Sequence, residues 1–148
     1  MVAEFDSQLV KVTIAEVLRR ELATERVRPE WAAFGTSTDP YQRAEGRYPL
    51  LPPIIDALAG ARISFSIRTK ESVIRRNLDQ LAVATQRANV ELLMSIAFLD
   101  EALQRLLVEP GAPSTVARLI TLCAMRDAGL AHTVPRADPA RTGRSRPN

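Results

Sequence analysis

The sequence has few of the features that disulfides, metal clusters and membrane spans require. Its 148 residues include a single cysteine, Cys123, which excludes a disulfide within the chain and a metal site built from several cysteines. No apolar run approaches the roughly 18 residues of a membrane-spanning helix, and the N-terminus has no signal-peptide pattern. We therefore expect a cytoplasmic protein that does not contact a membrane.

Lysine is also scarce, and the excess of basic charge is confined to the end of the chain. Only Lys11 and Lys70 are lysines, so 18 of the 20 basic residues are arginines. Four arginines and one aspartate follow residue 130, which leaves 16 basic and 16 acidic residues in residues 1–130. The first 130 residues are thus neutral and predict no nucleic-acid surface. The dispersed tail arginines would attract phosphates only weakly and in a salt-sensitive way.

The apolar residues that are present recur in an order typical of an α/β domain with a parallel sheet and right-handed crossovers. Period-2 alternation and short apolar runs predict strands over residues 31–34, 62–68 and 90–96. Spacings of three and four predict helices over about residues 12–23, from about Leu50 to a stop at Gly60, across residues 74–88, over 100–108 and over 114–128. No strand is predicted before the first helix.

The last helix begins with a Ser114 cap and is expected to end at Gly129. The apolar side of this helix consists of Val116, Leu119, Ile120 and Cys123, and we expect it to face the core. Cys123 would then be a buried structural cysteine. Residues 131–148 lack hydrophobic periodicity, so we expect a disordered tail that supplies no strand. The predicted organisation is one α/β domain over residues 1–130 and this tail.

The loop after the first predicted strand is the main candidate site. Residues 35–48, GTSTDPYQRAEGRY, place a glycine and short polar side chains at the end of a strand, where ligands bind in parallel sheets. From the residues alone, Thr36–Asp39 could also be a polar turn before Pro40. Lys70 could hold a carboxylate or be a solvated lysine, and Ser95 needs either a ligand or neighbouring backbone as its partner.

Four segments together resemble the radical SAM enzymes, in the branch that includes spore photoproduct lyase and its actinobacterial relatives. They run in order through roughly residues 5–130 and read GTSTDPYQRAEGRY, SFSIRTKE, LLMSIAFLDE and VEPGAPSTVARL…DAGL. The resemblance implies a partial (β/α) barrel in which a [4Fe-4S] cluster cleaves S-adenosylmethionine (SAM) to a 5′-deoxyadenosyl radical. It also implies contacts to SAM from Thr36, Ser37, Thr38, Asp39, Lys70 and Ser95, with the loop near the amino group and Lys70 near the carboxylate.

The chain departs from that family at both ends. The CxxxCxxC motif that holds the cluster is absent, and the family places it before the segment corresponding to residues 5–8. The last residues read like an out-of-frame translation. We expect an internal piece that lacks the first strand and the C-terminal strands, with no catalytic residue, no metal site and no SAM cleavage of its own.

Two alternatives remain open from the sequence. The chain could be a non-catalytic interaction or ligand-binding module whose open sheet edges pair with a second copy or with a separate cluster-bearing fragment. It could also be an unstable product without a function, because an incomplete parallel sheet leaves apolar faces uncovered. Nothing in the sequence identifies a substrate, nucleic acid included.

Overall fold

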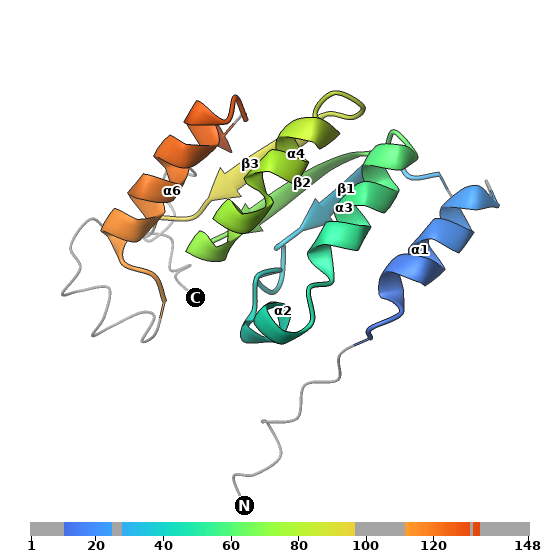
Figure 1. Cartoon of the computed structure of the whole chain (residues 1–148), viewed down its shortest axis with the longest axis horizontal. Coiled ribbons are helices and arrows are strands. Elements are labelled where there is room, and N and C mark those ends of the chain that lie inside the picture. The colour runs from blue at the N-terminus through green and yellow to red at the C-terminus, as the bar shows by residue number, and fades with distance from the viewer. Residues whose placement is uncertain (1–10, 25–27, 97–111, 131, 134–148) are drawn as a thin grey trace, which may run out of the picture.

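The computed structural model describes residues 11–24, 28–96, 112–130 and 132–133 (Figure 1). Within these residues the chain alternates helices with the strands of one sheet, so the predicted α/β fold with an open parallel sheet is confirmed. No helix in these ranges is long and apolar enough to cross a membrane.

The sheet is parallel, and its strands lie in the order of the chain. They are β1 (Trp31–Phe34), β2 (Ser64–Thr69), β3 (Val90–Met94) and the two-residue β4 (His132–Thr133). The register places Trp31 opposite Ser64 and Phe65 opposite Val90. The strand predicted over residues 31–34 is confirmed to the residue, and the next two are displaced or shortened by one or two residues at their ends.

The helices cover one face of this sheet (Figure 1). They are α1 (Ile14–Ala23), the short α2 (Arg43–Arg47), α3 (Leu51–Gly60), the 3₁₀ helix η1 (Ser72–Asn77), α4 (Leu78–Ala84) and α6 (Thr115–Asp127). Right-handed crossovers between strands that follow one another in order place every connecting helix on the same side. The helix α1 packs on α3 and lies beyond the edge strand β1.

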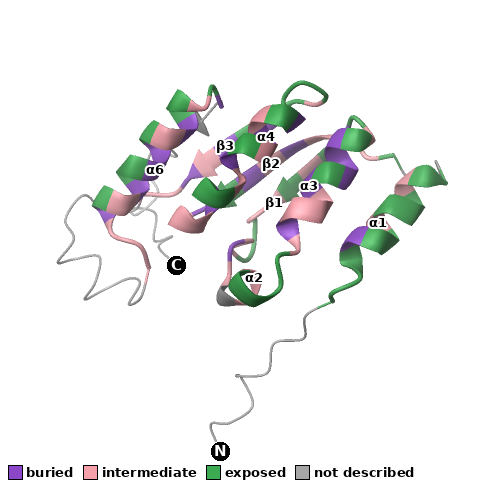
Figure 2. Cartoon of the chain, in the orientation of Figure 1, coloured by how far each residue is buried: buried purple, intermediate pink, exposed green. Residues whose placement is uncertain are grey.

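The core lies between the sheet and the helices, and strand alternation decides which side chains enter it. Phe65, Ile67, Leu92 and Met94 are fully buried against the helices, where Leu81 of α4 is also buried. Their strand neighbours are on the opposite face, which carries no helix in the described residues, and most of them are less buried (Figure 2). On that face the indole Nε1 of Trp31 donates to the Ser66 hydroxyl at 3.3 Å.

The turn from α3 into β2 corrects one prediction. Gly60 is the last residue of α3 rather than its stop, and Ala61 caps the helix in a right-handed conformation. The left-handed residue that turns the chain toward β2 is Arg62, two positions after Gly60, with a φ of +59°. The N–H of Ile63 then donates to the Leu58 carbonyl at 2.9 Å, which satisfies an end carbonyl of the helix without a glycine.

The end of the chain corrects a second prediction. We expected no strand after the last helix, but His132–Thr133 pair with β3, with Leu92 opposite His132. Parallel pairing uses backbone groups, so an edge strand can pair with a segment that has no hydrophobic pattern. The other residues of the expected disordered tail, and the helix expected over residues 100–108, lie outside the described residues.

Helix α6 corrects a third prediction, because it is turned the other way round. The side that faces the core carries Thr115, Arg118, Thr121, Leu122 and Met125. The predicted inner side faces solvent: Val116, Leu119 and Ile120 are 56%, 44% and 52% exposed, and Cys123 is exposed too. Two of the buried polar side chains donate to backbone carbonyls: Arg118 Nη1 to that of Ser95 and the Thr121 hydroxyl to that of Ala117, both at 2.8 Å.

Candidate functional site

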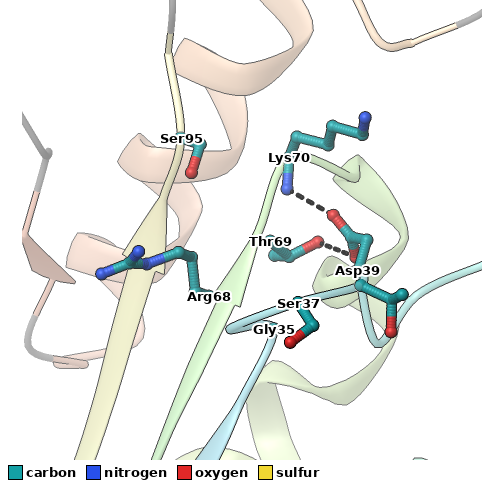
Figure 3. Close-up of a pocket in the computed structure, with 8 residues that line it drawn as sticks. Gly35, Ser37, Asp39, Arg68, Thr69, Lys70 and Ser95 are labelled. Atoms are coloured by element: carbon teal, nitrogen blue, oxygen red, sulfur yellow. Dashed lines mark hydrogen bonds between the residues drawn. The ribbon is translucent and has the colours of Figure 1, made fainter. Parts of the chain in front are cut away.

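The carboxyl ends of β1, β2 and β3 meet at a pocket of about 200 Å³ (Figure 3). In parallel α/β sheets this edge is where ligands bind, because loops with free backbone groups converge there. Eight residues from the three strand ends line the pocket, namely Gly35, Ser37, Thr38, Asp39, Arg68, Thr69, Lys70 and Ser95.

Gly35 allows the loop to leave β1 close against β2. Its φ of +84° lies in the left-handed region that favours glycine. A Cβ at this position would lie 2.9 Å from the carbonyl carbon of Arg68 and still closer to the carbonyl oxygen. The close approach brings the polar residues that follow Gly35 to the end of β2, so the pocket depends on this glycine.

Asp39 accepts three hydrogen bonds, two that fasten the loop to the end of β2 and one from within the loop. Its Oδ1 accepts from the Thr69 hydroxyl at 2.7 Å and from the Tyr41 N–H at 3.0 Å, and its Oδ2 accepts from the Lys70 N–H at 2.8 Å. Thr69 is 2% exposed, and its hydroxyl also accepts from the Glu71 N–H at 3.0 Å. Asp39 therefore has a structural role and also places one negative charge at the pocket.

A second carboxylate anchors the far end of the same loop. Glu45 accepts from the N–H groups of Leu50 and Leu51 at 3.0 and 2.9 Å, which caps the start of α3. Burial raises the pKa of Glu45 above its usual 4.5, and the two N–H donors partly oppose that shift. Between these two carboxylates, the hydroxyl of buried Tyr41 donates to Asn77 Oδ1 at 3.2 Å. The pKa of this phenol is raised mainly by its burial and further by the negative charges of Glu45 and Asp39.

Lys70 and Ser95 contribute from the ends of β2 and β3. The side chain of Lys70 extends away from the Asp39 carboxylate (Figure 3). Ser95 is held by its backbone, since its N–H donates to the Thr69 carbonyl at 2.9 Å and its carbonyl accepts from Arg118. The backbone of Ser95 thus has protein partners, while its side chain lines the pocket.

Five of the six predicted site residues come together here, and one does not. Ser37, Thr38, Asp39, Lys70 and Ser95 line the pocket, whereas exposed Thr36 is not among its lining residues. Gly35 was part of the candidate loop without an assigned contact, and sequence reasoning did not select Arg68 and Thr69 as site residues. Thr69 had a signal, because a threonine two positions after buried Ile67 occupies an inward position of the strand and needs a hydrogen-bond partner.

The described residues do not fit a [4Fe-4S] cluster. Such a cluster needs several thiolates, whereas the chain has a single cysteine, Cys123, which lies on the exposed side of α6. No group of three or more His, Cys, Asp or Glu side chains able to hold a metal occurs in residues 11–24, 28–96, 112–130 and 132–133. Any cluster chemistry would need ligands from elsewhere.

Similar proteins occur in mycobacteria. The chain is 48% identical over 128 residues to the uncharacterized protein Rv2578c of Mycobacterium tuberculosis strain H37Rv. It is equally similar to the uncharacterized proteins MT2655 of M. tuberculosis strain CDC 1551 and Mb2609c of M. bovis. The match covers 86% of this chain and 37% of each relative, so the chain spans little more than a third of their length. No family model and no solved structure matches it.

Proposed function

We propose that this chain is a segment of a radical SAM protein and that its pocket binds the methionyl end of SAM. The observation that carries the proposal is the convergence of Ser37, Thr38, Asp39, Lys70 and Ser95 at the carboxyl edge of the sheet. These residues come from three loops far apart in the sequence. The family resemblance had assigned each of them to SAM independently of any geometry.

The strand order supports the partial (β/α) barrel that this proposal requires. An open doubly wound sheet reverses its strand order and carries helices on both faces. Here the order is β1-β2-β3-β4 and the helices lie on one face, which is the arrangement of consecutive units in a barrel wall. In a barrel, the uncovered face with Trp31 and Ser66 would be the interior side.

The charges at the pocket suit a zwitterion such as the methionyl group. Asp39 offers a carboxylate to an ammonium, Lys70 offers an ammonium to a carboxylate, and the hydroxyls of Ser37 and Thr38 can donate or accept. SAM supplies a 5′-deoxyadenosyl radical in this family when a cluster reduces it. Because the described residues cannot hold the cluster, we assign this chain binding and orientation of SAM and no chemical step.

The cluster-bearing partner would be another polypeptide segment that pairs with the open sheet. The free edge of β1 has α1 projecting beyond it, and α1 is the one described long helix with no described strand before it. A parallel strand added at this edge would lie where a βα unit normally places the strand that precedes its helix. The mycobacterial relatives have ample additional length for such a segment.

The test is a titration of the isotope-labelled chain with SAM, followed by the backbone amide resonances. We expect shifts confined to residues 35–39, Lys70 and Ser95. Lys70→Ala should weaken binding by about tenfold, since a charge-assisted contact contributes roughly 1.5 kcal/mol. Lys11→Ala is the matched control, because Lys11 is the only other lysine and is exposed just before α1.

The outcomes separate this proposal from its rivals. Equal weakening by Lys11→Ala would show nonspecific charge attraction, and an absence of shifts at the pocket in millimolar SAM would overturn the binding proposal. Shifts from an unrelated zwitterion of similar size, with none from SAM, would favour a ligand-binding module of another kind.

A further inference from the structure

Arg68 lines the pocket but has no role in the proposed SAM site. It is the last residue but one of β2, and its side chain is exposed. Within the described residues, its guanidinium has no hydrogen-bond or ion-pair partner. A guanidinium is always charged and carries five N–H donors, so an exposed one at the ligand-binding edge of a parallel sheet is open to an anion.

The sheet face that carries Arg68 leaves room for a ligand. Arg68 and Ser66 alternate with buried residues of β2 and lie on the face that has no described helix (Figure 2). Next to Arg68, Gly35 has no side chain, and a Cβ there would come within 3.2 Å of the Arg68 Cβ. Figure 3 shows the Arg68 side chain directed away from Asp39 and Lys70, so it is separate from the two charges assigned to SAM.

The described acid on this face, Glu91, does not neutralise Arg68. Glu91 is exposed and lies opposite Ser66, whereas Arg68 lies opposite Leu93. The separation of two residues along β3 is about 7 Å, and in the described structure no ion pair joins the two side chains. Because Glu91 repels an anion further down the face, the favoured position for an anion is at Arg68, beside the carboxyl ends of the strands.

The charge balance of the pocket also leaves Arg68 uncompensated. Arg68 and Lys70 are the two basic lining residues and Asp39 is the one acidic one, so the lining carries a net positive charge. SAM adds another positive charge, because its sulfonium and ammonium outnumber its single carboxylate. With Lys70 assigned to that carboxylate, the surplus positive charge is at Arg68, and a second, anionic ligand would balance it.

We propose that Arg68 binds an oxyanion, a phosphate or carboxylate group of the second reactant, on the open sheet face beside SAM. The inference rests on the proposed SAM site, because a second reactant is required only where SAM is a co-reactant. The planar guanidinium offers two parallel N–H donors to two oxygens of one group, a fit that phosphate and carboxylate share. The substrate class is therefore an anion, which Arg68 binds and orients.

Titration of the isotope-labelled chain with inorganic phosphate at constant ionic strength tests the site. Phosphate should shift the Arg68 Nε–H and the amide of neighbouring Leu93 saturably, with SAM present as well as without it. Arg68→Gln should weaken phosphate binding at least about tenfold, because it removes a charge-assisted pair of hydrogen bonds. Arg87→Gln is the matched control, since Arg87 is an exposed arginine at the amino end of β3, outside the pocket.

A second titration, with malonate, identifies the source of the oxyanion. Tighter binding of phosphate assigns the site to a phosphorylated reactant, and tighter binding of malonate assigns it to a carboxylate. Arg68→Gln should weaken binding of the preferred anion more than it weakens SAM binding, whereas Lys70→Ala should weaken SAM binding more. Unchanged far-ultraviolet circular dichroism would confirm that the variants fold.

The outcomes separate this proposal from the SAM proposal. It would be overturned by an absence of saturable shifts at Arg68 in millimolar phosphate and malonate, or by equal weakening in Arg87→Gln. Displacement of phosphate by SAM would also overturn it, because both would then occupy one subsite. Saturable phosphate binding at Arg68 in a chain that does not bind SAM would support the oxyanion site and overturn only the SAM proposal.

Discussion

The loop over residues 35–48 and the helix α6 contrast in how composition relates to burial. The loop is polar, yet Asp39 and Glu45 tie it to the end of β2 and the start of α3 through four hydrogen bonds, and Asp39 accepts a fifth from Tyr41 within the loop. The helix α6 has an apolar side, yet that side faces solvent while Arg118 and Thr121 are buried. In these two regions, residue type alone therefore does not decide which side chains are buried.

The contrast also separates structural from functional candidates. In the loop, the two carboxylates accept hydrogen bonds from fixed N–H and O–H donors, which leaves the hydroxyls of Ser37 and Thr38 as the more adaptable groups. In α6, apolar Leu122 and Met125 share the core-facing side with buried polar side chains, while the apolar residues on the opposite side face solvent. The sharpest tests break one anchor at a time in each region.

The largest effect is expected for Gly35→Ala. The new Cβ would collide with the Arg68 carbonyl at a φ that alanine rarely adopts, so we expect a loss of about 3 kcal/mol from backbone strain and overpacking together. Urea unfolding measures the change. Gly46→Ala is the matched control, since nothing lies within 4 Å of a Cβ there and alanine should be neutral or stabilising. Equal losses in both variants would contradict the close approach of the loop to β2.

A smaller but clear effect is expected for Asp39→Asn. If the amide oxygen keeps the bonds at Oδ1, the amide nitrogen faces the Lys70 N–H, and two donors then oppose each other. We expect a loss of about 2 kcal/mol in unfolding free energy, because a buried donor is left without its acceptor. Asp79→Asn, on the exposed side of α4, is the control and should cost much less. A small loss for Asp39→Asn would mean that the loop is held mainly by Gly35 and Tyr41.

The sequence predicted the strands β1, β2 and β3, the helix α3 and the cap of α6 because these depend on local patterns. Buried Phe65 and Ile67 alternate with more exposed serines, and Ser114 accepts from the Ala117 N–H at 3.1 Å as a helix cap should. The clustering of Ser37, Lys70 and Ser95 was also predictable, since parallel strands place their carboxyl ends at one edge.

The failures have a common cause, which is that periodicity identifies an apolar side without identifying what it packs against. In α6 the pattern selected the apolar side that faces solvent, whereas the core-facing side combines Leu122 and Met125 with a buried arginine and two threonines. The two-residue β4 escaped prediction because backbone pairing leaves no side-chain pattern. Arg62 was missed as the turn residue because a left-handed arginine is uncommon and nothing in the sequence marks it.

Ser114→Ala tests the local anchor of α6 and should have a moderate effect. The variant loses the hydrogen bond from the Ala117 N–H, so we expect a loss of about 1 kcal/mol, as for other helix caps. Ser114→Asp keeps an acceptor at the same place and should restore most of that stability. Thermal unfolding of the three proteins measures the series. If the aspartate variant were as unstable as the alanine variant, the cap would not explain where α6 begins.

The smallest effect is expected at Glu45, and it should appear as a change in pH dependence. Burial raises the folded-state pKa of this carboxyl above its usual 4.5, so the folded chain binds the proton more tightly than the unfolded chain. Its contribution to stability is therefore fully present below pH 4.5 and declines as the pH rises through the folded-state pKa. Glu45→Gln removes this decline, so the stability of the wild type relative to the variant should be greater at about pH 4 than at about pH 7. Urea unfolding at both pH values measures the difference. A relative stability that rises with pH would mean that the two N–H donors at the start of α3 outweigh the burial of the carboxylate.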